Sequence, residues 1–200
     1  HPPQVKTLKA AVVDRREAMQ LLMGYNSFNG YVWNKLFDLQ LIRKNDIRFH
    51  ADYPSCEDTM FVGSYLYHCS RVCVTEECLY CYRQVSGGAN RGRYSGRKAY
   101  DPKWMSVFEM TEYMADLYKD DAVTAACRLH EVREAGIVLR SMEAAGYHGA
   151  DHARLKGFLR RGASLFFRDE NSGRSQKLSV LLSCISPKLE LAVWKLRNRK

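Results

Sequence analysis

The chain has 200 residues, a formal net charge of +9 and a hydrophobic fraction of 46%. This length supports one hydrophobic core, or one domain with an appendage, and the composition excludes general disorder. No apolar run approaches the roughly 20 residues that cross a bilayer, and the first residues show no signal-peptide pattern. Seven irregularly spaced cysteines indicate reduced thiols, so we expect a cytoplasmic protein, either unattached or peripheral at the inner face of the cell membrane.

Helical periodicity predicts two helices within the first 45 residues. The first runs from Asp14, as its N-cap, to Gly24. The second is expected at about 33–45, where apolar residues recur at helical spacing. Those apolar positions are Val32, Leu36, Leu39 and Ile42.

Trp33 stands beside Asn34 and Lys35 at the start of this second helix. Such a group is usually part of a core with a polar edge. An aromatic ring next to hydrogen-bonding side chains also suits a sugar-binding platform. The residue types leave both interpretations open.

Two adjacent acids, Glu57 and Asp58, open an apolar run that predicts a helix at about 56–69. Ser55 as N-cap with Asp58 three residues later resembles a capping box, and the helix dipole favours acids in a first turn. A carboxylate fixed at a helix start and facing a cleft could also act as a general base. The two roles are compatible, because the same turn can hold a reactive group.

The next segment, "RVCVTEECLYCYRQ", alternates β-branched or aromatic residues with others and predicts one or two strands. Cys78 and Cys81 have the spacing of half a zinc site. On a strand, however, positions three apart point to opposite faces, which favours buried thiols. Arg83 could bind a diphosphate bidentately, or it could pack as a surface residue over a tyrosine.

Residues 87–101 form a basic, Gly-rich loop that lacks a Walker pattern and lacks a G-x-G-x-x-G turn. After Pro102, helical periodicity recurs to the C-terminus and predicts a bundle of four or five helices. We therefore divide the chain into three parts: 1–86, 87–101 and a helical domain at 102–200.

Residues 151–200 contain 12 basic and 4 acidic residues. This excess favours phosphate-bearing partners such as a nucleotide, a nucleic acid or an anionic membrane, although a basic surface can also serve solubility alone. The basic amphipathic segments here are either bundle helices with solvated faces or helices that lie on a membrane.

Four motifs occur in one order, "WNKLF", "IRF", "CEDTMF" and "LYCYR", between residues 33 and 83. Together they resemble the second half of bacterial family 2 glycosyltransferases, which build capsule, exopolysaccharide and lipopolysaccharide glycans. The resemblance covers residues 12 to about 86. The helices after residue 102 fit only as a variable C-terminal extension.

The resemblance implies an acceptor-side portion of a GT-A type fold, followed by a helical C-terminal domain, in an α+β and predominantly helical chain. It implies inverting transfer from a nucleotide-sugar donor to a glycan or lipid-linked acceptor, without a nucleic-acid partner. Asp58 would be the base that deprotonates the acceptor hydroxyl, with Glu57 beside it placing the acceptor. The substrate-binding positions that it implies are Trp33, Asn34, Lys35, Tyr82 and Arg83.

This sequence departs from the family by lacking the donor-binding "D-D-G-S" turn and the "D-x-D" metal motif. A metal-bridged diphosphate needs such carboxylates. We therefore expect Mn²⁺ or Mg²⁺ to bind in a full-length enzyme, no metal or other cofactor in this chain, and an inactive isolated chain. The alternative is a non-catalytic basic binding module, either a zinc-stapled nucleic-acid-binding domain or a membrane-docking domain.

Overall fold

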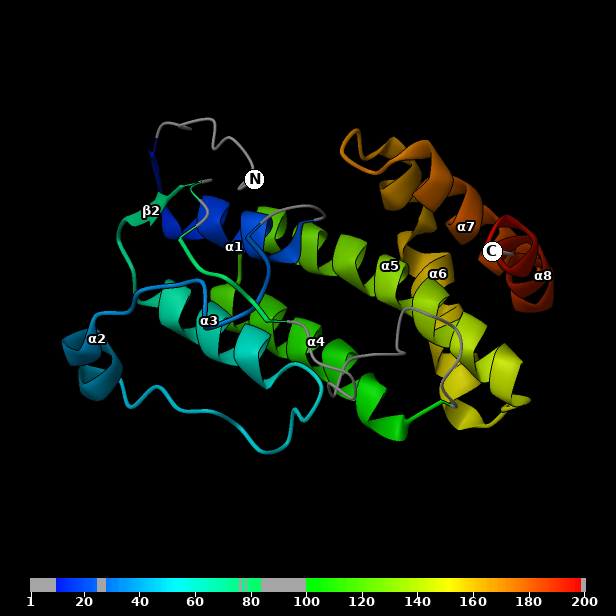
Figure 1. The fold of residues 1–200 in the computed structure, drawn as a ribbon, viewed down its shortest axis with the longest axis horizontal. Coiled ribbons are helices and arrows are strands. Elements are labelled where there is room, and N and C mark those ends of the chain that lie inside the picture. The colour runs from blue at the N-terminus through cyan, green and yellow to red at the C-terminus, as the bar shows by residue number, and fades with distance from the viewer. Residues whose placement is uncertain (1–9, 25–27, 76, 78, 84–99, 199–200) are drawn as a thin grey trace.

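A computed structural model describes residues 10–24, 28–75, 77, 79–83 and 100–198. It is mostly helical with a two-stranded sheet, which confirms the predominantly helical α+β class (Figure 1). The elements are β1 (Ala11–Val13), α1 (Arg15–Met23), α2 (Leu39–Lys44), α3 (Glu57–Tyr67), β2 (Val72–Val74), a 3₁₀ helix (Pro102–Met105), α4 (Ser106–Tyr118), α5 (Asp121–Ala145), α6 (Ala150–Arg168), α7 (Arg174–Ile185) and α8 (Pro187–Arg197).

The sheet is a short antiparallel pair in which Ala11 lies opposite Val74 and Val13 lies opposite Val72. The sequence pattern predicted strand structure around β2 but not its partner β1. It also predicted strand character further along, whereas residues 79–83 are irregular. A strand needs a hydrogen-bonding partner, and β1 supplies one for only three residues.

The predicted first helix is confirmed as α1. The Asp14 carboxylate accepts a hydrogen bond from the Glu17 backbone N–H at 2.9 Å, and Gly24 follows the last turn. The helix predicted at 33–45 is wrong in its first half, because α2 begins at residue 39. The Asp38 side chain caps that start by accepting from two backbone N–H groups, and Leu36 is fully exposed.

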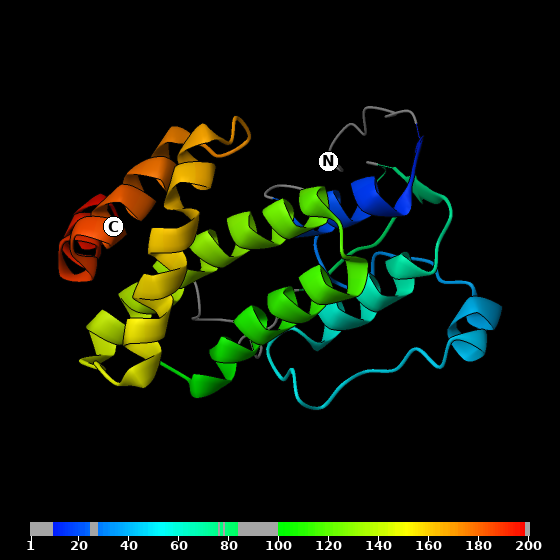
Figure 2. The same ribbon diagram turned by 180° about the vertical axis from the view of Figure 1, so that it is seen from behind.

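The second half contains five α-helices within the described residues, and α5 lies at their centre. It packs against α1, α4, α6, α7 and α8 (Figures 1 and 2). Ser186 lies between the last two helices, and Pro187 is the first residue of α8. The Ser186 hydroxyl accepts from the Leu189 backbone N–H at this junction. The α7–α8 hairpin lies at one end of the molecule and α2 lies at the other.

Two hydrophobic clusters form the main core, and both use α5. The first joins α1 and α3 to α4 and to the N-terminal half of α5. The second joins α4, α6 and α7 to the remainder of α5. The first cluster therefore crosses the boundary predicted at 87–101, whereas the buried residues of the second all lie after it.

Two glycines of α6 provide a matched test of the α5–α6 contact. A Cβ at Gly162 would collide with the Val132 side chain, whereas a Cβ at Gly157 would meet only the flexible end of Arg161. We expect Gly162→Ala to lower the free energy of unfolding by about 1–3 kcal/mol through overpacking. Gly157→Ala should raise it by about 0.5–1 kcal/mol through helix propensity. Urea unfolding followed by circular dichroism measures both, and equal effects would contradict the close contact.

Candidate functional site

A cleft of about 820 Å³ runs between the first turn of α3 and the α7–α8 hairpin. The part of α5 between residues 130 and 140 contributes to it, at positions 130, 133, 134, 136, 137 and 140. Glu57 and Asp58 line the cleft at the α3 side, together with the loop at 29–31. The structure thus places the two predicted acids in a concave site rather than on an open helix end.

The capping box predicted for Ser55 and Asp58 is wrong. The N-cap of α3 is Cys56, whose side chain makes no capping hydrogen bond. The start of α4 holds these residues instead, because the Ser55 N–H donates to Ser106 Oγ at 3.4 Å and the Cys56 thiol donates to the Ser106 carbonyl at 3.4 Å. Asp58 is half-buried at the second position of the helix. Its carboxylate makes no hydrogen bond within the described part of the chain.

Lys35 lies near Asp58 and ties together the loop that faces α3. Its ammonium donates to the carbonyl oxygens of Phe28, Asn29 and Tyr31 and to Asn34 Oδ1, at 2.7–3.2 Å. Burial lowers the pKa of the Lys35 ammonium to about 8, and the Asp58 charge opposes that shift. Lys35 therefore both fixes the loop and places a cation next to the candidate base.

Two further contacts hold this loop against the first turn of α3. Asn34 Nδ2 donates to the Phe28 carbonyl at 3.1 Å. Gly30 lies so close to Thr59 that any Cβ at this position would collide with the Thr59 side chain. Asn34 and Lys35, predicted as substrate-binding residues, thus have their polar atoms engaged in shaping the wall beside Asp58.

Trp33 is the centre of an aromatic stack. The rings of Tyr31, Tyr80 and Tyr82 lie within 4.8–5.1 Å of its ring, at interplanar angles of 18–30°. The structure therefore brings the predicted residues Trp33 and Tyr82 together, and the three tyrosines remain substantially exposed. Arg83 follows the stack, is exposed, and makes no ion pair among the described residues.

The α5 side of the cleft carries residues that no sequence motif indicated. Arg133 donates to the Met23 carbonyl at 2.7 Å and contacts His130 Nδ1 at 2.8 Å. It thereby satisfies the C-terminal end of α1, which has no basic residue in its last turn. These residues are about 110 positions apart, so local pattern could not reveal the contact.

Further along the cleft, Arg140 and Glu190 form a buried ion pair. Arg140 Nη1 donates to Glu190 Oε1 at 2.8 Å, and Ser179 Oγ donates to the same oxygen at 2.6 Å. The Arg140 guanidinium also lies 5.0 Å from the ring centroid of Trp194. This network links α5 to both helices of the hairpin and fixes that side of the cleft.

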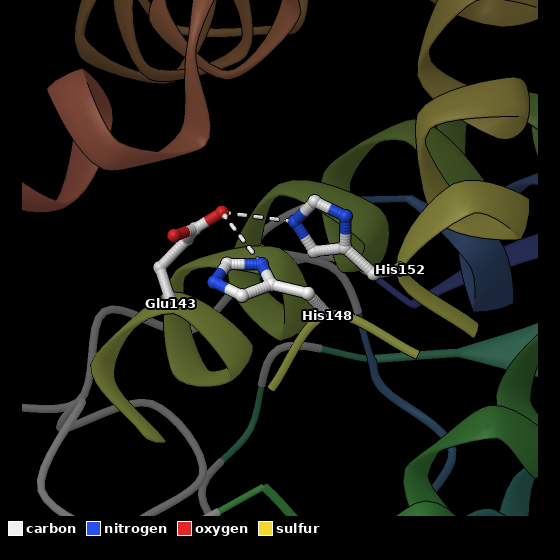
Figure 3. A group of neighbouring side chains, drawn as sticks. All are labelled: Glu143, His148 and His152. Carbon is white, nitrogen blue, oxygen red and sulfur yellow. Dashed lines mark hydrogen bonds and ion pairs between the residues drawn. The ribbon is translucent and has the colours of Figure 1, made fainter. Parts of the chain in front are cut away.

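A cluster of three potential metal ligands lies outside the cleft, where α5 turns into α6. It consists of Glu143, His148 and His152 (Figure 3). The half zinc site considered around Cys78 and Cys81 falls partly outside the described residues and stays a prediction. Among the described residues, the potential ligands at 68–81 form no cluster of three, and Cys78 lies outside those residues.

Comparison of the chain with protein-family models, with curated proteins and with solved structures finds no match. Among the described residues, no helix has the length and apolar character needed to cross a bilayer.

Proposed function

We propose that this chain is the acceptor-side part of an inverting glycosyltransferase that transfers a sugar from a nucleotide-sugar donor. The observation that supports this most is the placement of Asp58. Its carboxylate is fixed at the start of α3, lines the cleft and has no hydrogen-bond partner in the described chain. A structural cap would use that carboxylate, whereas a general base needs it available.

In the proposed reaction, Asp58 accepts the proton of an acceptor hydroxyl as the hydroxyl oxygen attacks the anomeric carbon. The bond from that carbon to the diphosphate oxygen breaks, and the nucleoside diphosphate leaves with its electron pair. The Asp58 carboxylate stands in the first turn of α3, where the helix dipole favours an acid, and lies near the Lys35 charge. Glu57, one residue earlier and exposed at the cleft, is placed to accept a hydrogen bond from another acceptor hydroxyl.

The aromatic stack supports a sugar-binding role for the nearby surface. Because its ring packs against three tyrosines, Trp33 acts as the centre of the platform, and the exposed tyrosines supply the outer surface. Sugar C–H faces pack on such rings, and the phenol hydroxyls add hydrogen bonds. We place Tyr82 and Arg83 at the edge of this platform, where Arg83 is available for a diphosphate.

The divalent metal implied for such an enzyme does not fit the acids of this cleft. Among the described residues, none of the cleft acids belongs to a group of three metal-ligating side chains, and Glu190 is committed to Arg140. These acids are Glu57, Asp58, Glu134 and Glu190. We therefore assign a Mn²⁺ or Mg²⁺ site to the donor-binding part of a longer enzyme.

The α7–α8 hairpin favours peripheral contact with an anionic membrane, which suits a lipid-linked acceptor. Several exposed basic residues accompany its exposed apolar side chains. The exposed apolar residues are Leu178, Leu181, Ile185, Leu189 and Leu196.

A transfer assay on the full product of the gene tests the proposal. We expect release of a nucleoside diphosphate from one member of a panel of nucleotide sugars, with Mn²⁺ or Mg²⁺ and an oligosaccharide acceptor present. The 200-residue chain alone should give none, because it lacks the donor motifs. If the full product transfers no sugar but binds nucleic acid with a strong salt dependence, the basic binding module is correct instead.

A further inference from the structure

We propose that Glu143, His148 and His152 bind a divalent transition-metal ion, with Zn²⁺ the best match, at the junction of α5 and α6. Glu143 belongs to the last turn of α5, His148 to the connecting turn and His152 to the first turn of α6 (Figure 3). None of the three lines the cleft, so this site is separate from the proposed transferase chemistry.

The distances between the ligand atoms are close to those of a tetrahedral zinc site. Glu143 Oε1 lies 2.9 Å from His152 Nε2 and 3.8 Å from His148 Nδ1. All three ligand atoms lie within 4.8 Å of one another. Zinc–ligand bonds of about 2.0–2.2 Å place neighbouring ligands about 3.4 Å apart. Small side-chain movements would therefore admit the ion.

Electrostatics at this position also favour a cation. The Glu143 side chain is only 4% exposed, and it lies at the C-terminal end of α5, where the helix dipole is negative. A buried carboxylate at that end needs a positive partner. The contact with His152 Nε2 engages one carboxylate oxygen, and a metal ion bound by all three residues would supply the positive charge.

The backbone between the two helices holds the three residues in place without the ion. Gly146 ends α5 in the left-handed conformation, with φ of 70°, and so turns His148 back toward Glu143. The Tyr147 N–H donates to the Met142 carbonyl at 2.9 Å. Beyond this turn, Tyr100 Oη donates to Asp151 Oδ2 at 2.7 Å and so anchors the start of α6. The three ligand residues are thus held by a turn whose backbone is fixed by these contacts.

The ligand types select the class of metal. Two imidazoles with one carboxylate suit Zn²⁺ and related transition-metal ions, whereas Mg²⁺ and Ca²⁺ prefer oxygen ligands. His148 is 49% exposed, so a water molecule can complete the coordination from the solvent side. This donor set differs from the all-carboxylate metal motif expected of a donor-binding half. The proposal also departs from the sequence-based expectation that this chain holds no metal.

The proposal is tested with the untagged, EDTA-treated protein titrated with Co²⁺ and then with competing Zn²⁺. We expect one equivalent of Co²⁺ to give a visible d–d spectrum without a thiolate charge-transfer band, and Zn²⁺ to displace it. His148→Ala should weaken Zn²⁺ binding by more than about tenfold, because even residues that only support ligands cost 10–100-fold. Since His148 is half-exposed, this variant should still fold, whereas Glu143→Gln and His152→Ala alter buried groups.

His50→Ala serves as the matched control, because His50 is exposed in the loop before α3. It should bind Zn²⁺ as the wild type does, and Zn²⁺ should raise the thermal midpoint of the wild type and of His50→Ala but not of His148→Ala. Absence of stoichiometric binding would overturn the proposal. Unchanged Zn²⁺ affinity in His148→Ala would also overturn it. Loss of Zn²⁺ binding in a Cys73→Ser/Cys81→Ser variant would overturn it as well, because it would assign the ion to the thiols.

Discussion

Asp58→Asn should lower sugar transfer by the full gene product about 10²–10⁴-fold, the usual contribution of a general base. Asparagine has the same shape as aspartate but cannot accept the acceptor proton. The Asp58 carboxylate makes no hydrogen bond in the described chain, so its replacement should leave the thermal midpoint almost unchanged. Initial rates at saturating donor and acceptor, together with a melting curve, measure the two effects separately.

Two comparisons isolate the role of Asp58. Asp52→Asn changes an exposed carboxylate six residues earlier and should keep full turnover. Glu57→Gln should raise the KM for acceptor more than it lowers kcat, because Glu57 is assigned to placing the acceptor. If Asp58→Asn retains full turnover, Asp58 is not the base.

The effect of the Asp58 charge on Lys35 can be followed in the isolated chain, independently of activity. The Asp58 charge raises the Lys35 pKa, so Asp58→Asn should lower that pKa below about 8 in an NMR titration.

Removing one partner of the Arg140–Glu190 pair should lower the free energy of unfolding by about 3–5 kcal/mol, because it leaves an uncompensated buried charge. Glu190 is 3% exposed, and its second carboxylate oxygen is buried without a hydrogen-bond partner in the described chain. Arg140→Ala and Glu190→Ala should therefore both be strongly destabilising in urea unfolding. Because the pair holds the hairpin against α5, Trp194 fluorescence should also change in variants that remain folded.

The double variant Arg140→Met/Glu190→Leu removes both charges and should recover most of the loss, since apolar residues of similar volume can replace a buried pair. Arg154→Ala is the surface control. Arg154 is paired with Glu109 and Glu112 at 3.5–3.7 Å with about half of each side chain exposed, so its loss should cost less than about 1 kcal/mol. If Arg140→Ala and Glu190→Ala lower the free energy of unfolding as little as Arg154→Ala does, the pair does not position the hairpin.

Local patterns predicted the elements whose ends are set by neighbouring residues. Asp14 and Gly24 delimit α1 as the sequence indicated, and the helical periodicity after Pro102 corresponds to the five α-helices described there. Prediction failed where a distant contact decided the local structure. Ser55 does not cap α3, because Ser106, about 50 residues away, engages its backbone. Apolar spacing at 33–38 suggested a helix, but Asp38 caps a later start and the preceding loop is organised around Lys35.

The candidate site was partly accessible from the sequence. The acids at 57–58 and the tryptophan at 33 were identified, and the structure brings them to the same region through the contact of Gly30 with Thr59. The Arg140–Glu190 pair could not have been identified, because it joins residues 50 positions apart that share no motif. The Glu143, His148 and His152 group was missed, although its three residues fall within ten positions and their spacing was visible.

Helix α5 has 25 residues, a length of about 37 Å, and contributes to both hydrophobic clusters. Its first turns complete the cluster around α1 and α3, and the remainder completes the cluster around α6. The first cluster therefore needs residues from both halves of the polypeptide, whereas the buried residues of the second all lie between residues 104 and 180. A protease cut between residues 87 and 101 would leave two fragments that each lack part of their packing, so they should stay together as a nicked complex and denature in a single transition. A truncation that keeps only residues 1–86 should yield an insoluble product, because the first cluster would lose its members from α4 and α5.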